Sequence, residues 1–161
     1  MSDRTGTFYA AEDSIQGYGA QLEVGNGASP EVFEAVAFIK RVKFAETKTS
    51  DVDRTHLRSP NAHKEHAPGM SDSSPLEFEG IYVPTERSLS TAGGGSGAFA
   101  AGGLPYLRAQ RATHNFKVVT EGGTTVEVRG YVAGFSIGEL QEDGTVMYTG
   151  SIQPTQAVDL P

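Results

Sequence analysis

The four histidines are the first residues of this sequence that could do chemistry. Three of them lie close together in mid-chain: His56, His63 and His66. A zinc-binding helix needs two histidines four residues apart with a glutamate beside them. His63 and His66 are three apart, in a segment with prolines at 60 and 68 and no helical pattern. This spacing argues against a metal site, so we expect neither a metal nor any other cofactor.

Other catalytic arrangements are equally weak. The chain has no cysteine, and no Gly-x-Ser-x-Gly elbow follows a strand pattern. The glycine stretch at 93–97 lacks the Lys and Ser/Thr that complete a phosphate-binding loop. Glu77 and Glu79 share one face of an alternating segment, which is typical of the wet side of a half-buried sheet. We therefore expect a protein that is not an enzyme and takes no small-molecule substrate.

Charge and hydropathy exclude further classes. The 161 residues include 20 acidic and 13 basic side chains, for a net charge of −7. Affinity for nucleic acid comes mainly from Lys and Arg neutralising phosphates, so this chain is a poor DNA binder, although DNA could pass along it without sticking. No apolar run approaches the ~20 residues that cross a bilayer, and the N-terminus lacks a signal-peptide pattern. We expect a protein made in a cytoplasm, with no membrane partner.

Alternating segments predict a mainly β protein. Turn signatures such as Gly25-Asn26-Gly27 and Glu142-Asp143-Gly144 separate them. We expect one helix at 104–113, with Pro105 in its first turn, and strands at 21–24, 32–46, 76–83, 116–120, 124–137 and 145–153. Runs of strands with one short α-helix favour a β-sandwich or a partly closed barrel, as a single domain over residues 1–161.

The segment 32–46 is expected to be one long strand. Its apolar residues Val36, Phe38, Val42 and Phe44 fall on one parity, which predicts one buried face. Lys40 interrupts that face, and either a β-bulge or a lysine at a sheet edge would explain it.

Three segments have no periodicity. We expect residues 1–16 to form an N-terminal arm, 47–74 a long loop and 88–103 a flexible, Gly-rich loop. A structureless excursion of more than ~15 residues is uncommon in a compact domain and usually has a function. A monomer gains little from ordering such a segment, so we expect a neighbouring subunit to supply the missing burial.

Several motifs resemble a known family. The most specific feature is the order of TSDVDRTHL at 49–57, Pro68-Gly69 and LEFEG at 76–80. A weaker likeness follows in GYVAGFS at 130–136 and TGSIQPT at 149–155. With these motifs, the sequence resembles the tail tube protein (major tail protein) of long-tailed bacteriophages and gene transfer agents.

The resemblance implies a tail-tube-like fold that closes into a hexameric ring, with rings stacked into a tube. Segment 47–74 would be an inter-subunit loop, and the arm would reach an adjacent ring. The loop residues expected to make polar contacts between subunits are Asp51, Asp53, Arg54, His56 and His63. The candidates for an acidic, lumen-facing wall are Glu77, Glu79, Glu127, Thr149 and Ser151.

The resemblance also implies partners and a location. The chain would bind further copies of itself and, at the ends of the tube, a terminator and a baseplate or distal tail protein. DNA would pass through the lumen without specific binding, and the protein would be found in the tail of the virion.

Two other readings remain open at this point. One is a monomeric β-sandwich binding module for carbohydrate or peptide. That class needs a solvent-facing aromatic cluster, whereas this chain has no tryptophan and most of its Tyr and Phe alternate at positions expected to be buried. The other is a different ring protein, such as a secretion-system tube or a tail terminator, which fold-level physics barely separates from a tail tube.

Overall fold

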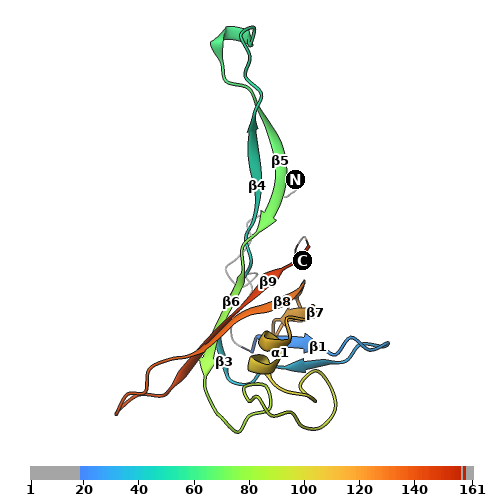
Figure 1. Ribbon diagram of the computed structural model, residues 1–161, viewed down its shortest axis with the longest axis vertical. Coiled ribbons are helices and arrows are strands. Elements are labelled where there is room, and N and C mark those ends of the chain that lie inside the picture. Colours follow the sequence, from blue (N-terminus) through green and yellow to red (C-terminus); the bar gives the residue numbers. More distant parts are fainter. Residues whose placement is uncertain (1–18, 157, 159–161) are drawn as a thin grey trace, which may run out of the picture.

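A computed structural model describes residues 19–156 and 158 of the chain (Figure 1). The expected arm at 1–16 lies outside these residues. One α-helix is present among them, α1 (Leu104–Gln110), together with a short 3₁₀ turn at Pro60–Ala62. The strands are β1 (Gln21–Gly25), β2 (Phe33–Ala35), β3 (Ile39–Lys43), β4 (Thr47–Asp53), β5 (His66–Ser73), β6 (Leu76–Ile81), β7 (His114–Val119), β8 (Thr125–Ile137) and β9 (Met147–Pro154).

Seven of these strands form one antiparallel sheet in the order β2-β1-β7-β8-β9-β6-β3. Its two end strands are consecutive in the chain and are joined only by residues 36–38. The sheet must therefore curl until its ends approach each other, yet β2 and β3 do not pair, so the barrel stays open. This confirms the expected class: mainly β, antiparallel, with one short helix and a sheet that is only partly closed.

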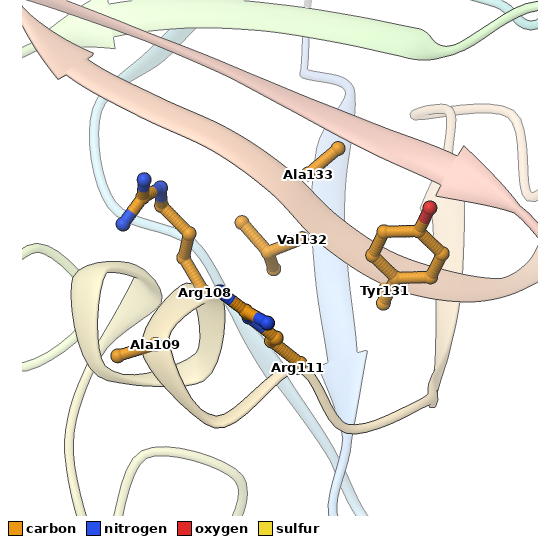
Figure 2. A pocket seen from close by; sticks show the side chains of 6 residues that line it. All are labelled: Arg108, Ala109, Arg111, Tyr131, Val132 and Ala133. Carbon is orange, nitrogen blue, oxygen red and sulfur yellow. The ribbon is translucent and has the colours of Figure 1, made fainter.

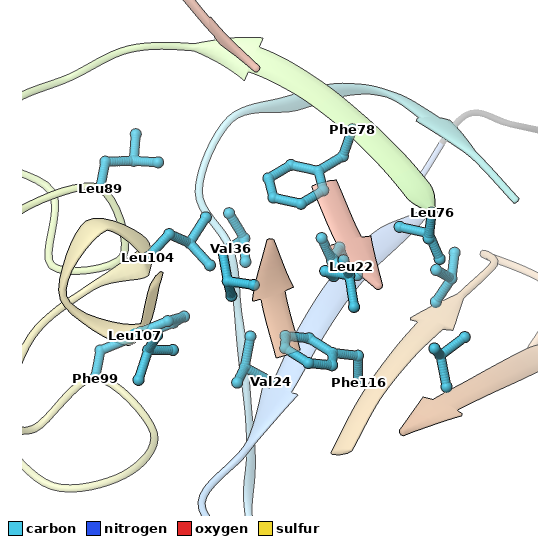
Figure 3. Close-up of a cluster of buried hydrophobic side chains, with 14 of the residues drawn as sticks. Leu22, Val24, Val36, Leu76, Phe78, Leu89, Phe99, Leu104, Leu107 and Phe116 are labelled. Carbon is cyan, nitrogen blue, oxygen red and sulfur yellow. The ribbon is translucent and has the colours of Figure 1, made fainter. Parts of the chain in front are cut away.

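The hydrophobic core lies on one side of the curled sheet, beneath α1 and the loop that precedes it (Figure 3). Strand alternation turns one parity inward, as in Leu22 and Val24 of β1 or Phe116 and Val118 of β7. The Tyr148 ring stacks on Phe135 at 5.7 Å between centroids, and its hydroxyl donates a hydrogen bond to a backbone carbonyl in the 36–38 connector. Burial raises the pKa of Tyr148.

The prediction of one long strand at 32–46 is wrong. It is divided into β2 and β3 at residues 36–38, where Phe38 has a left-handed backbone (φ 57°) that ends the strand. Only Val36 of the four apolar residues is fully buried, and Phe38 and Phe44 are 51% and 43% exposed. The bulge alternative for Lys40 is confirmed, because the register between β3 and β6 shifts between Ile39 and Arg41.

Residues 88–103 form a loop, as expected, but this loop packs against the core. This segment has no helix or strand, but Leu89 and Phe99 insert into the core with at most 1% of their surface exposed. Arg87 and Glu34 form an ion pair at 2.9 Å beside it, and the backbone N–H of Phe99 donates to the same carboxylate. Here the glycines permit close packing: a Cβ at Gly93 would lie 2.0 Å from a backbone carbonyl oxygen.

The helix and the later strands lie close to their expected positions. α1 ends at Gln110 rather than at 113, because Arg111 adopts the left-handed conformation (φ 56°) that terminates helices. Its Pro105 lies in the first turn, as expected. No helix among the described residues is long and apolar enough to cross a membrane.

Candidate assembly surfaces

Segment 47–74 is not structureless, which corrects the expectation from its sequence. It forms an antiparallel hairpin of β4 and β5 that projects away from the body (Figure 1). All seven residues of β4 are exposed, so both faces of the hairpin meet solvent. A strand with two wet faces has no reason to alternate apolar and polar residues, which is why the period-two signal is absent.

Polar pairs across the two strands hold the hairpin together. The Thr47 and Ser73 hydroxyls lie 3.2 Å apart, the Thr49 and Ser71 hydroxyls 3.3 Å apart, and Asp51 pairs with His66 at 2.6 Å. In the part of the chain that the structure describes, its connection to the body is confined to the base, where residues 46 and 74 exchange hydrogen bonds and Gln153 donates to the Ser73 carbonyl. The hairpin is thus a separate arm on a narrow base.

The tip of the hairpin has its own hydrogen-bond network. Asp53 accepts the backbone N–H of Thr55 at 2.8 Å, and hydrogen bonds from Thr55 hold the pKa of this aspartate below its usual value. The Thr55 hydroxyl in turn accepts the N–H of Glu65. The Glu65 carboxylate lies 3.3 Å from the His56 ring and accepts the Ser59 hydroxyl. These contacts fix the shape of an otherwise solvated tip.

All five residues expected at a subunit contact lie on this hairpin. Asp51, Asp53 and His56 bind within it, as described above. Neither the Arg54 nor the His63 side chain has an ion pair or side-chain hydrogen bond within the described part of the chain. Contacts to a neighbouring subunit therefore stay a prediction for all five.

Sequence reasoning missed the apolar residues of the hairpin. Val52, Leu57 and Met70 are 46%, 107% and 86% exposed. Burying one such side chain contributes ~1.5–3 kcal/mol. A partner that covered all three side chains would therefore gain a substantial free energy of binding. The signal was present in the sequence, as isolated apolar residues in a polar segment, but it is indistinguishable there from ordinary surface residues.

The five lumen candidates share the solvent face of the main sheet, opposite the core. Glu77 lies opposite Ser151 across the β6–β9 ladder, and Glu79 lies opposite Thr149. Glu127 is exposed on the same face, but in the first half of β8, which pairs with β7. The four residues on β6 and β9 therefore form one contiguous patch, and Glu127 is separate from it.

This face is less acidic than expected. On β3, Arg41 and Lys43 lie opposite Glu79 and Glu77, with nitrogen–oxygen distances of 3.4 and 3.8 Å. Farther along the sheet, Lys117 lies 3.5 Å from Glu23. Arg41 and Lys43 alternate with Val42. Once β3 was known to pair with β6, this pattern could have placed them on the same face as the glutamates.

Within the described residues, the sheet has one free edge on each side of this patch. β3 ends the strand order, so its outer edge is unpaired. β8 pairs with β7 only as far as Gly130, so the same edge of residues 131–137 is unpaired as well. Between these edges lies a four-stranded section: the second half of β8, then β9, β6 and β3.

No cluster of three or more His, Asp or Glu side chains placed to hold a metal occurs among residues 19–156 and 158. His114 is half-buried at the start of β7, and burial, with Arg129 nearby, lowers its pKa. Its Nε2 atom is buried without a partner in this part of the chain. A lowered pKa at one histidine does not by itself identify a catalytic site.

Comparison with known proteins gives a result for structure alone. No family model matches the sequence, and no curated protein matches it either. Chains of several solved assemblies match the fold. One belongs to the tail of an empty gene transfer agent (GTA) particle with C6 symmetry, at a TM-score of 0.64 and 13% identity, covering 92% of this chain and 99% of that one.

Two other assemblies contain similar chains. A chain in the structure of the sheath/tube terminator of PVC, an extracellular contractile injection system, in the extended state gives a TM-score of 0.65 at 13% identity, covering 94% of this chain and 99% of that one. The SPP1 tail tube gives 0.54 at 12% identity, covering 92% and 80%. The chain therefore has the tail-tube fold that the sequence motifs predicted.

Proposed function

We propose that this protein is the structural subunit of a tail tube in a phage or phage-like particle. Copies assemble into stacked six-membered rings around a conduit for DNA. The observation that carries the proposal is the β4–β5 hairpin, an ordered arm with no core of its own that leaves Val52, Leu57 and Met70 in solvent. In the tube, these side chains are buried against neighbouring subunits.

The two free edges support ring closure. The four strands of the section from β8 to β3 alternate in direction. When copies are related by rotation about one axis, β3 of one copy therefore runs antiparallel to β8 of the next, which is the favourable pairing for a continuous ladder. The two edges differ, so the contact is head-to-tail, and closing the ring leaves neither of these two edges unpaired.

The size of such a ring suits the proposed task. Six copies with four strands each, spaced ~4.8 Å apart and tilted by ~40°, give a backbone diameter of roughly 40–50 Å. That bore admits a DNA duplex with space for side chains on the wall. If the patch containing Glu77 and Glu79 lines the bore, the paired Arg41 and Lys43 leave its wall nearly neutral. DNA then passes without a strong attractive field.

The same fold supports a second candidate, a subunit that terminates a tube. The similar chain from PVC belongs to a structure of a sheath/tube terminator. A terminator and a tube subunit share ring closure but differ in stacking: a terminator binds the next ring on one side only. Neither the tube subunit nor the terminator is proposed to have an enzymatic role. In both cases the protein is part of a virion or virion-like tail and has end-of-tube partners.

Electron microscopy of the purified full chain over a range of concentrations tests the proposal. We expect hollow tubes of stacked rings with six-fold end views. Single rings that never stack would favour the terminator. A monomer at every concentration, measured by analytical ultracentrifugation, would refute both and restore the binding-module reading.

A further inference from the structure

A cleft with two arginines lies where the unpaired edge of β8 begins (Figure 2). Its volume is about 710 Å³, which is room for side chains of a partner, since one water takes only ~30 Å³. Both arginines are exposed and have no side-chain partner within the described part of the chain. The lining residues come from α1 and from β8: Arg108, Ala109, Arg111, Tyr131, Val132 and Ala133.

An unexplained aromatic residue lies at the opposite edge of the sheet. Phe44 directly follows β3 and is 43% exposed, although it is bulky and apolar. It comes two residues after Val42, which pairs with the core residue Phe78, so it continues the parity of the core side of the sheet. On β8, the core side is the side that α1 covers.

We propose that the cleft between α1 and β8 receives Phe44 of a neighbouring copy of this chain. The inference rests on the ring proposed above and names the contact that closes it. Antiparallel pairing of β3 with the free edge of β8 brings the Lys43 end of β3 to the Tyr131 end of β8. Phe44 then lies on the side of the sheet occupied by α1, at the cleft.

The chemistry of the two surfaces is complementary. Ala109 is exposed and provides apolar contact for the Phe44 ring. The guanidinium of Arg108 can stack on the face of the ring, an interaction worth more when water is excluded. Glu46 lies two residues farther along the chain, and its exposed carboxylate has only a 3.7 Å ion pair with Lys48. The Glu46 carboxylate can therefore act as the counterion of the two arginines in the cleft.

Cysteine cross-linking tests the contact directly, because the chain contains no cysteine of its own. In assembled protein that carries Phe44→Cys and Ala109→Cys, a short thiol cross-linker should give a ladder up to the closed ring on a denaturing gel. A mixture of the two single variants should stop at the dimer, since the contact is head-to-tail. The matched control, Phe38→Cys with Ala109→Cys, uses the other end of β3 and should give less than about a tenth of that product.

A second variant measures how much the contact contributes. Phe44→Ala should keep the unfolding midpoint of the monomer and raise the critical concentration for assembly about 30-fold or more, as expected for an interface hot spot. Tubes without cross-links in the Phe44 pair, cross-linking as strong in the control pair, or normal assembly of Phe44→Ala would each overturn this inference and leave the tube proposal standing. A wild-type chain that never assembles would overturn both.

Discussion

Removing the hairpin separates the stability of the body from its assembly. The paired positions Thr47 and Ser73 at its base can be joined directly by Asn-Gly, a two-residue turn suited to an antiparallel ladder, in place of residues 48–72. The hydrogen bonds between residues 46 and 74, and that from Gln153 to Ser73, are kept. The change deletes only residues outside the core.

The expected effect on stability follows from that design. No core side chain is lost, so there is no cavity penalty. Shortening an excursion of about 25 residues to two lowers the entropy cost of loop closure by at most about 2 kcal/mol. The free energy of unfolding should therefore stay unchanged or rise by up to about 2 kcal/mol. Assembly into tubes should be lost, because the apolar residues of the arm are gone.

Urea unfolding followed by circular dichroism, below the assembly concentration, measures the first quantity, and electron microscopy measures the second. A matched control keeps the backbone of the hairpin and replaces only two apolar side chains, with Leu57→Ser and Met70→Ser. It should fold like the wild type and assemble more weakly. A drop of several kcal/mol on excision would show that the hairpin belongs to the body, and normal tubes would show that it has no role in assembly.

Three smaller changes test the body. Gly93→Ala should destabilise by about 1–3 kcal/mol in urea unfolding, because its Cβ would lie 2.0 Å from a carbonyl oxygen; Gly94→Ala, with its nearest neighbour at 3.9 Å, is the near-neutral control. Tyr148→Phe removes a 2.8 Å hydrogen bond and should cost about 1 kcal/mol by the same assay. Burial lowers the pKa of His114 in the folded protein, so the unfolded chain takes up a proton first as the pH falls. The contribution of His114 to the free energy of unfolding is therefore complete above pH 6.5 and falls as the pH drops below that value. His114→Gln should flatten this part of the stability–pH curve, and an unchanged slope would contradict the assignment.

Sequence reasoning found the elements whose patterns are strong. In β6 through β9, alternation of buried and exposed residues reports one wet and one dry face, so the strands could be placed to within a few residues. Pro105 marked the start of α1 for a reason that is purely local. Parity alone placed Glu77 and Glu79 on one face of their strand, and the family resemblance grouped them with Thr149 and Ser151.

The features that the sequence did not predict have a common physical cause, because each depends on which strands pair. β4 and β5 are stabilised by polar cross-strand pairs such as Thr49 with Ser71, and these have no apolar period to detect. Phe38 broke a strand pattern that looked continuous, because the chain must turn from one edge of the sheet to the other there. The cations opposite Glu77 and Glu79 become visible only once β3 is known to lie beside β6.

The charge pattern of the two free edges explains why they would join each other and not themselves. β3 carries Lys40, Arg41 and Lys43 within five residues, so two β3 edges placed together would set like charges opposite one another. The free part of β8, residues 131–137, contains no charged residue and can accept a cationic strand without repulsion. Pairing β3 with β8 therefore costs less than pairing β3 with β3. This selects a head-to-tail contact over a two-fold dimer, and only a head-to-tail contact can be repeated around a ring.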